Sequence, residues 1–304
     1  IKLFKVPSDL AANEIYLLAW TTTPWTLPSN AALAVAENID YVLVSTYNQY
    51  TSLPVNVVLA ADLVSKYFPE KNATLKLSDY QKGDKQIPFV IHNTVKGKSL
   101  TGLVYEPLLP YVTPSGKAFE VIAGDFVSTE DGTGIVHIAP TFGADDFRVA
   151  KQAGISAIMV KDLNDLTGKN EMPLVDKRGR FVNEVTDFAG EPVKEEFLSE
   201  QEKEQERLKQ GRDKYLNVDE RIAIKLKTEN KAFKVEKYEH TYPHCWRTDK
   251  PVLFYPLDSW FVKTTAAKER MIELNNTINW KPASTGTGRF GNWLENLVDW
   301  NLSR

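Results

Sequence analysis

The stretch GTGIVHIAPTFGADD, residues 132–146, carries in one run the parts from which a mixed fold can be built. Gly132 and Gly134 permit a close approach of the backbone, and a short apolar strand, expected at 134–139, follows them. A Pro/Gly loop then opens a helix, expected at 144–153, with two carboxylates in its first turn. This order places polar side chains where a strand ends and a helix begins.

Three polar side chains of this stretch are candidates for chemistry. His137 alternates with Val136 and Ile138, so we expect it to point away from their face, toward whatever cavity the strand borders. A hydrogen-bonded polar residue without function is the plainer interpretation. Asp145 and Asp146 diverge by about 100° on a helix, so only one of them should address a ligand. Complementarity to the helix dipole explains both without a ligand, whereas a carboxylate in a pocket would suit a cationic amine.

A second unusual stretch is WTTTPWTLPSN, residues 20–30, in which four threonines lie near two prolines. Pro24 and Pro28 should hold the chain extended and prevent a helix. Successive threonine hydroxyls would then offer donors and acceptors in different directions. A β-branched strand that runs into a proline turn accounts for the same residues without any ligand.

Periodicity predicts a β-rich first half and a charged helical insertion. Further strands are expected at 15–21, 41–46, 55–60, 120–127 and 155–160, and a helix at 60–68. Residues 191–240 hold 13 acidic and 12 basic side chains, which fits two amphipathic helices in a solvated insertion better than a nucleic-acid arm. Their sparse apolar stripe comprises Phe197, Leu198, Val218, Ile222 and Leu226.

Composition bounds the class of protein. The 304 residues carry 37 basic against 40 acidic side chains and are 42% hydrophobic, as in a globular protein, which excludes a disordered or collagen-like chain. Prolines interrupt the long uncharged runs, so no membrane span is expected. The single cysteine, Cys245, indicates a reducing compartment such as the cytosol. Because the chain begins at Ile1, we expect it to be part of a longer protein.

One metal-like cluster, His240, His244 and Cys245, is present, but Pro243 makes a shared helical face improbable and no second cysteine follows. Zinc is therefore not expected. The chain also lacks a P-loop, a serine nucleophile elbow and a dinucleotide fingerprint.

Residues 20–30 and 132–146 together resemble the two core motifs of the editing (CP1) domain inserted in isoleucyl-tRNA synthetases. Valyl and leucyl relatives typically carry Thr-Thr-Arg-Pro in the first motif and lack a histidine at the place of His137. Thr141 and Phe142 stand where bacterial relatives often carry Gly and His, which favours a eukaryotic-type cytosolic enzyme. The resemblance continues through 236–247 and 280–304, which are similar to segments that lead back to the family's catalytic core.

The resemblance implies an α+β fold, a mixed β-barrel-like editing domain with peripheral helices. It places the editing domain at 1–235, with the charged insertion at about 191–235, and a return segment at 236–304. It also implies hydrolysis of valine wrongly esterified to tRNA(Ile), and of valyl-adenylate as a further candidate substrate. A catalytically silent tRNA-docking module of the same family is the alternative.

The resemblance also implies roles for individual residues. Asp146 would bind the α-ammonium of the misplaced amino acid, while Thr21, Thr22 and Thr23 would hold the ester and terminal adenosine and help to place water. His137 would line the side-chain pocket. Further substrate contacts would come from Trp25, Gly134, Ala139 and Asp145.

None of these residues is an activated nucleophile, so the expected reaction is direct attack by a positioned water. No cofactor or metal is expected for editing, since ATP and Mg²⁺ belong to a catalytic domain whose His-Ile-Gly-His-like and Lys-Met-Ser-Lys-Ser-like motifs are missing here. The expected partners are the 3′ end of tRNA(Ile) and the remainder of the parent synthetase. The expected state is a cytoplasmic monomer without membrane contact.

Overall fold

The computed structural model describes residues 1–4, 10, 14–162, 168 and 170–303. Its contacts divide the chain into two units, Ile1–Tyr255 and Pro256–Arg304, which are described separately. The predicted domain boundary after residue 235 stays a prediction. Residues 236–255, which follow this boundary, belong to the first unit, where Tyr238 donates a hydrogen bond to Asp131.

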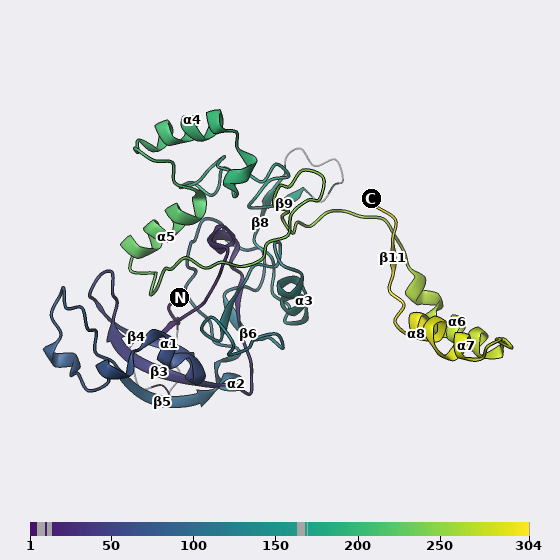
Figure 1. Ribbon diagram of the computed structural model, residues 1–304, viewed down its shortest axis with the longest axis horizontal. Helices are drawn as coiled ribbons and strands as arrows, with labels where there is room; N and C mark the ends of the chain where they lie inside the picture. Colours follow the sequence, from purple (N-terminus) through teal and green to yellow (C-terminus); the bar gives the residue numbers. More distant parts are fainter. Residues whose placement is uncertain (5–9, 11–13, 163–167, 169, 304) are drawn as a thin grey trace. The chain divides into compact units, whose positions relative to one another are not determined.

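The first unit contains a four-stranded sheet in the order β1 (Tyr16–Leu17), β4 (Pro54–Ala60), β3 (Asp40–Tyr47) and β5 (Val90–Lys96) (Figure 1). β1 pairs parallel with β4, and the other pairs are antiparallel. The strands predicted from apolar runs at 41–46 and 55–60 are confirmed. β5 was not predicted, because most of its side chains are exposed and it therefore lacks an apolar period.

A three-stranded sheet carries the first motif described above. Its order is β6 (Glu120–Ala123), β2 (Ala32–Val35) and β7 (Ile135–Ile138), with β2 parallel to β6 and antiparallel to β7. All four side chains of β2 are buried, so this strand also lacks the alternation by which a half-buried strand is recognised. A separate hairpin pairs β8 (Met159–Lys161) with β9 (Glu171–Pro173).

The expectation of a barrel-like sheet is corrected by this topology. A barrel requires the edge strands of a sheet to pair with each other. In the described part of the chain, both larger sheets are open, with β1 and β5 at the edges of one and β6 and β7 at the edges of the other. The fold is therefore mixed α+β without a closed barrel.

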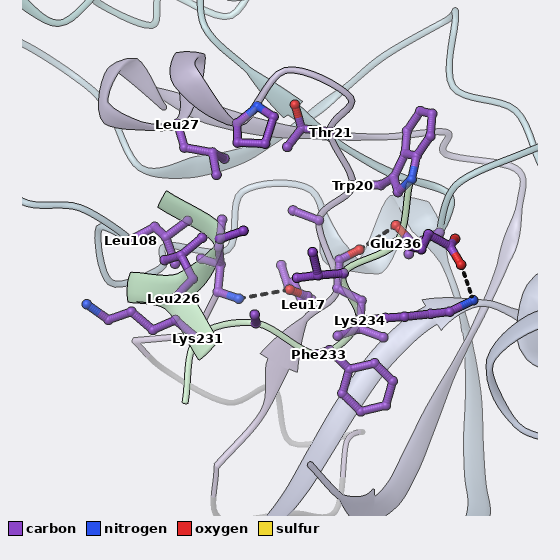
Figure 2. A pocket seen from close by; sticks show the side chains of 18 of the residues that line it. Leu17, Trp20, Thr21, Leu27, Leu108, Leu226, Lys231, Phe233, Lys234 and Glu236 are labelled. Atoms are coloured by element: carbon purple, nitrogen blue, oxygen red, sulfur yellow. Dashed lines mark hydrogen bonds and ion pairs between the residues drawn. The ribbon is translucent and has the colours of Figure 1, made fainter. Parts of the chain in front are cut away.

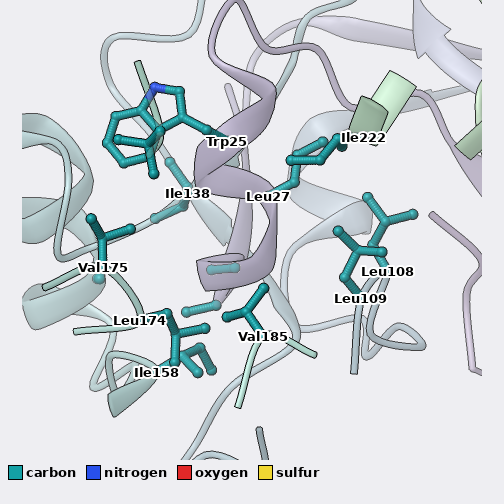
Figure 3. Packing of buried hydrophobic residues seen from close by; sticks show 14 of the residues in the cluster. Trp25, Leu27, Leu108, Leu109, Ile138, Ile158, Leu174, Val175, Val185 and Ile222 are labelled. Carbon is teal, nitrogen blue, oxygen red and sulfur yellow. The ribbon is translucent and has the colours of Figure 1, made fainter. Parts of the chain in front are cut away.

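Three hydrophobic clusters follow from the alternation of side chains across these sheets. One cluster draws on a face of each larger sheet, including Leu33 of β2 and Leu43 of β3. Another covers the opposite face of the three-stranded sheet and includes Ala34, Ile138 and Trp25; Figure 3 shows Ile138 close to Trp25. A third covers the opposite face of the four-stranded sheet. The three-stranded sheet is thus covered on both faces, which explains why its residues are so completely buried.

Five α-helices of the first unit are described: α1 (Val64–Tyr67), α2 (Gly97–Leu100), α3 (Ala144–Gln152), α4 (Glu200–Gln210) and α5 (Val218–Thr228). The predicted helix at 144–153 is confirmed as α3, whereas 60–68 forms a 3₁₀ turn followed by α1. Further 3₁₀ helices are η1 (Pro24–Ser29), η2 (Ala61–Leu63), η3 (Glu70–Asn72), η4 (Leu77–Asp79) and η5 (Glu195–Phe197).

The charged insertion forms the two predicted helices, but they differ in burial. Both begin with a capping box, set by Ser199 in α4 and by Asn217 in α5. α4 buries no side chain, as expected of a solvated helix. α5 buries Val218, Ile222 and Leu226 in the same cluster as Trp25, so it is part of the core and not a solvated appendage.

The second unit is small and helical. It contains α6 (Lys268–Thr277), α7 (Ser284–Thr287) and α8 (Arg289–Glu295), preceded by the 3₁₀ helix η6 (Thr264–Ala267). The antiparallel pair β10 (Phe261–Val262) and β11 (Trp300–Asn301) closes it. None of the helices in the described ranges of the chain is long and apolar enough to cross a membrane.

Candidate functional site

The two motifs lie side by side in the first unit. Trp20 donates its backbone N–H to the carbonyl of Ile135 (3.0 Å), and Ala31 donates to the carbonyl of Ile138 (2.9 Å). Leu33 of β2 pairs directly with His137 of β7. The chain leaves β7 through a short loop and enters α3, so the strand end and helix start predicted from the sequence form one region with the threonine-rich segment.

The part of the threonine-rich segment from Pro24 to Ser29 is helical, contrary to the expectation that its prolines would keep it extended. Residues 24–29 form the 3₁₀ helix η1, closed by hydrogen bonds from Thr26 N–H to the Thr23 carbonyl (3.0 Å) and from Asn30 N–H to the Leu27 carbonyl (3.1 Å). Pro24 occupies the first helical position, where a backbone N–H is not needed and the fixed φ angle of proline suits a helix. In so short a helix, Pro28 removes only one bond.

Hydroxyl groups hold this turn together from within. Thr21 Oγ1 accepts a hydrogen bond from the backbone N–H of Thr23 (3.1 Å). The Thr26 hydroxyl donates to the Thr23 carbonyl (2.9 Å) and lies 3.4 Å from the Thr23 hydroxyl. Thr22, which lies between Thr21 and Thr23 in the sequence, is half-buried. The predicted cluster of hydroxyl groups is therefore an ordered turn whose geometry depends on Thr26, which the sequence analysis did not assign to the site.

His137 connects this turn to the three-stranded sheet. Its side chain is only 6% exposed, with Nε2 3.0 Å from Thr26 Oγ1 and Nδ1 2.7 Å from Asn30 Nδ2. The Asn30 amide nitrogen is a donor, because its oxygen accepts from the Tyr105 hydroxyl (2.7 Å). His137 Nδ1 therefore accepts, and Nε2 carries the proton and donates to Thr26.

Burial lowers the pKa of His137 from 6.5 to about 4, so the ring is neutral at physiological pH. The prediction that His137 points away from the face of Ile138 is confirmed, since it lies on the Ile135 side of β7 and reaches Tyr105 through Asn30. There, both ring nitrogens of His137 already have hydrogen-bond partners. Its predicted place in a side-chain pocket stays a prediction.

The two carboxylates at the start of α3 diverge as expected. Asp145 is 67% exposed and pairs with Arg148 (3.3 Å), which also pairs with Asp125 (2.6 Å). Asp146 turns inward, where its Oδ2 accepts the backbone N–H of Ala139 (2.8 Å). The structure thus separates a solvated carboxylate from an inward one.

Burial raises the pKa of Asp146 from 3.8 to about 6, and the neighbouring charge of Asp145 adds to this shift. Gly143 makes the inward orientation possible. A Cβ atom at this position would lie 2.8 Å from Asp146 Cγ, closer than van der Waals contact allows. Asp146 is therefore a half-buried carboxylate that is charged at neutral pH at a cost in free energy, which a cationic ligand would reduce.

Two buried polar atoms near these motifs have no hydrogen-bond partner among the described residues: Trp25 Nε1 and Thr141 Oγ1. Trp25 contacts Phe142 edge-on, with ring centroids 5.0 Å apart, so both atoms belong to the junction of the two motifs. Buried polar groups in proteins are nearly always paired. The indole N–H of Trp25 and the hydroxyl of Thr141 are therefore two exceptions to this rule at the junction of the motifs.

A cavity of about 200 Å³ opens beside the threonine-rich segment. Trp20, Thr21 and Leu27 line one side, and the segment from Lys231 to Glu236 lines another, with an ion pair of 2.8 Å between Lys234 and Glu236 (Figure 2). Of the predicted site residues, its lining includes Thr21 and does not include Thr22, Thr23, Trp25, Gly134, His137, Ala139, Asp145 or Asp146. Nothing in the pattern of the charged insertion indicated that its last residues would line a cavity.

The metal-like cluster identified in the sequence is not assembled. His240 Nδ1 and His244 Nδ1 each lie about hydrogen-bond distance from a backbone carbonyl, at 3.0 Å and 2.9 Å. Within the described ranges, no three His, Cys, Asp or Glu side chains are placed to hold a metal ion. That editing needs no metal or other cofactor stays a prediction.

Comparison with known families adds independent information. The family model described as tRNA synthetases class I (I, L, M and V) matches residues 14–304. The chain is 72% identical to isoleucine–tRNA ligase of Cytophaga hutchinsonii over 293 residues, which are 96% of this chain and 26% of that protein. It is 54% identical to isoleucine–tRNA ligase of Bacteroides fragilis over 309 residues, 95% of this chain and 26% of that protein.

The chain thus spans about a quarter of the length of the curated relatives that it matches. These relatives are bacterial and give no support to the eukaryotic type inferred from Thr141 and Phe142. Among solved structures, the Plasmodium falciparum cytosolic leucyl-tRNA synthetase editing domain matches with a TM-score of 0.34 and 12% identity, over 73% of this chain and 67% of that one. The structure described as GlLeuRS-CP1 matches with a TM-score of 0.32 and 17% identity, over 47% and 46%.

Proposed function

The chain belongs to the class I tRNA synthetases of the isoleucine, leucine, methionine and valine group, and from this premise we propose that it is the editing domain of an isoleucine–tRNA ligase. Its reaction would be the hydrolysis of valine wrongly esterified to tRNA(Ile), with valyl-adenylate as a second substrate. The observation that carries the proposal is Asp146, an inward carboxylate in the motif whose strand β7 is hydrogen-bonded to Trp20 and Ala31, in a chain so similar to isoleucine–tRNA ligases.

In the proposed site, Asp146 binds the α-ammonium group of the valyl ester. A carboxylate whose pKa burial has raised to about 6 is still ionised at pH 7, and pairing with a cation offsets the cost of its burial. This contact fixes the amino acid end of the substrate. It also rejects molecules that lack a free amine, such as a peptide-linked residue.

The threonine-rich turn would hold the ester and the terminal adenosine. Thr21, Thr22 and Thr23 contribute hydroxyl groups on a turn that is fixed by its own hydrogen bonds and by His137. A water held by these groups attacks the ester carbonyl carbon, the bond to the ribose oxygen breaks, and that oxygen takes up a proton as valine leaves. Catalysis then depends on orientation and electrostatics, because none of these residues is an activated nucleophile.

Editing would serve the accuracy of the parent enzyme. A synthetic site separates side chains that differ by one methylene by only about 1–3 kcal/mol, a limit for which isoleucine against valine on isoleucyl-tRNA synthetase is itself the standard example. A second site that is too small for isoleucine supplies the remaining discrimination. The proposed partners are the valine-bearing 3′ end of tRNA(Ile) and the rest of the synthetase, in the cytoplasm and as a monomer. ATP and Mg²⁺ would serve the parent's activation domain only.

The proposal is tested by following the release of valine from valyl-tRNA(Ile) on addition of the full-length gene product. We expect rapid release, and slow release from isoleucyl-tRNA(Ile) under the same conditions. Equal rates for the two substrates would contradict a selective editing site. Tight binding of valyl-tRNA without release of valine would favour the docking alternative. A crystal soaked with a non-hydrolysable valyl-adenosine mimic would separate the two functions, because only the editing site requires Asp146 to contact the amine of the mimic.

A further inference from the structure

The charged insertion contacts the threonine-rich turn directly. Asp219, in the first turn of α5, accepts the backbone N–H of Trp25 at Oδ1, with an N···O distance of 2.7 Å. This N–H belongs to the first turn of η1, where backbone donors have no partner within the helix. A side chain 194 residues away in the sequence therefore caps the start of η1.

The surrounding contacts hold Asp219 in place. Ile222, one turn further along α5, lies in the same apolar cluster as Leu27 of η1, so the two helices are packed together (Figure 3). Lys194 Nζ lies 3.9 Å from the second carboxylate oxygen and also 4.6 Å from the centre of the Tyr242 ring. Asp219 is thus fixed by its helix, by an apolar contact and by a partly shielded cation.

Keeping this carboxylate where it is costs free energy. Burial raises the pKa of Asp219 to about 6, and Lys194 offsets only part of that shift. A neutral or apolar residue could pack in the first turn of α5 without this cost. The carboxylate offsets part of this cost by accepting the hydrogen bond from the Trp25 backbone N–H.

We propose that Asp219 is a positioning residue for the editing reaction, which holds the backbone of η1 so that the threonine hydroxyls keep their orientation toward the substrate. The inference rests on the proposed function. Trp25 lies between Thr23 and Thr26, and Thr26 is bound in turn by His137. The turn is therefore held from two sides, by α5 through Asp219 and by β7 through His137. Release of one side would shift hydroxyl groups whose placement by about 1 Å matters for the rate.

The test compares Asp219→Ala and Asp219→Asn in the full-length gene product, with hydrolysis of valyl-tRNA(Ile) as the measurement. Asp219→Ala removes the acceptor, and we expect kcat to fall roughly tenfold or more while KM changes little. Asp219→Asn keeps an amide oxygen that can accept the same N–H, so it should retain most of kcat. Asp213→Ala and Asp213→Asn are matched controls on an exposed position of the same insertion and should leave kcat unchanged.

A loss of stability alone must be separated from a loss of positioning. Rates are therefore compared per folded molecule, at a temperature below the thermal midpoint of every variant. If Asp219→Ala does not fold, Asp219→Glu retains the charge but displaces the acceptor by one methylene, and kcat should fall several-fold. Normal kcat in the folded Ala variant, or in the Glu variant when Ala does not fold, would overturn the inference and leave the proposed function intact. Absence of hydrolysis by the unaltered protein would overturn the proposed function and, with it, the inference.

Discussion

Two polar side chains of one motif, nine positions apart, differ in their hydrogen bonding and charge in this structure. His137, inside β7, has hydrogen-bond partners on both ring nitrogens. Asp146, at the start of α3, turns inward and accepts a backbone N–H with one oxygen. The comparison shows that one polar side chain of the motif has all its hydrogen-bonding atoms paired, while the other is an inward carboxylate with no cationic partner among the described residues, which is why we assign the proposed binding role to Asp146.

The pKa shifts of the two residues have the same cause and different consequences. Burial favours the neutral form of both, lowering the pKa of His137 to about 4 and raising that of Asp146 to about 6. At pH 7 the histidine is in its favoured neutral form, whereas the aspartate is charged against the preference of its surroundings. Of the two residues, only Asp146 is therefore in its disfavoured form at pH 7, and pairing with a cation would lower the free energy of that charged form.

Removing the carboxylate should have the largest effect on activity. Asp146→Ala leaves the substrate amine without its counter-charge, and loss of one partner of a buried charge pair costs about 2–5 kcal/mol. We expect the rate of valine release to fall on the order of 10³-fold, as measured by single-turnover hydrolysis of valyl-tRNA(Ile). Asp40→Ala, which removes an exposed carboxylate paired with Lys96, is the control and should leave the rate unchanged. Full activity of Asp146→Ala would contradict the assignment of Asp146 as the residue that binds the substrate amine.

Removing the histidine should mainly cost stability. His137→Ala leaves Thr26 and Asn30 without their partner and opens a cavity, so the free energy of unfolding should fall by about 3 kcal/mol. Urea unfolding at pH 7 measures this change, with His92→Ala as the control, because His92 is exposed on β5. A loss no larger than that of the control would show that the network does not support the fold.

The pH dependence of hydrolysis should report Asp146. Its carboxylate must be ionised to bind an ammonium group, so the rate should fall as the pH drops through about 6, the pKa raised by burial. His137 stays neutral until about pH 4 and contributes nothing to this step. The profile of single-turnover rates between pH 5 and 8 tests this, with the denaturant stability of the same samples as the control. A rate that does not change across this range would contradict the assignment.

A smaller and opposite effect on stability is expected at the same position. The pKa of Asp146 is higher in the folded than in the unfolded chain, so its contribution to stability is present below pH 3.8 and is lost as the pH rises through about 6. Asp146→Asn imitates the neutral form, so at pH 7 it should unfold with a free energy about 1–3 kcal/mol larger than the unaltered protein, the upper figure corresponding to the full pKa shift. The gain should shrink between pH 6 and pH 4. A destabilised Asn variant at pH 7 would mean that the charged form is already well accommodated.

Local patterns were informative where a run of apolar, β-branched residues is bounded by turn residues or where a helix has an acidic first turn. The strands β3, β4 and β7 follow from such runs, and the start of α3 follows from its acidic first turn. β2 is buried on both faces and β5 is mostly exposed, so neither has the period by which a strand is recognised. The two prolines of residues 20–30 were misjudged because a 3₁₀ helix with a proline at its first position tolerates them.

The residue types of the site and their order along the chain are readable in residues 20–30 and 132–146, and so is the family to which the chain belongs. Which of these residues faces inward, which is neutral and which merely supports the others is not readable there. Those properties depend on burial and on partners supplied from far along the chain, as Asn30 does for His137 across 107 positions and Asp219 for Trp25 across 194. Hydrogen bonding and desolvation act on neighbours in space, and only folding brings these neighbours together.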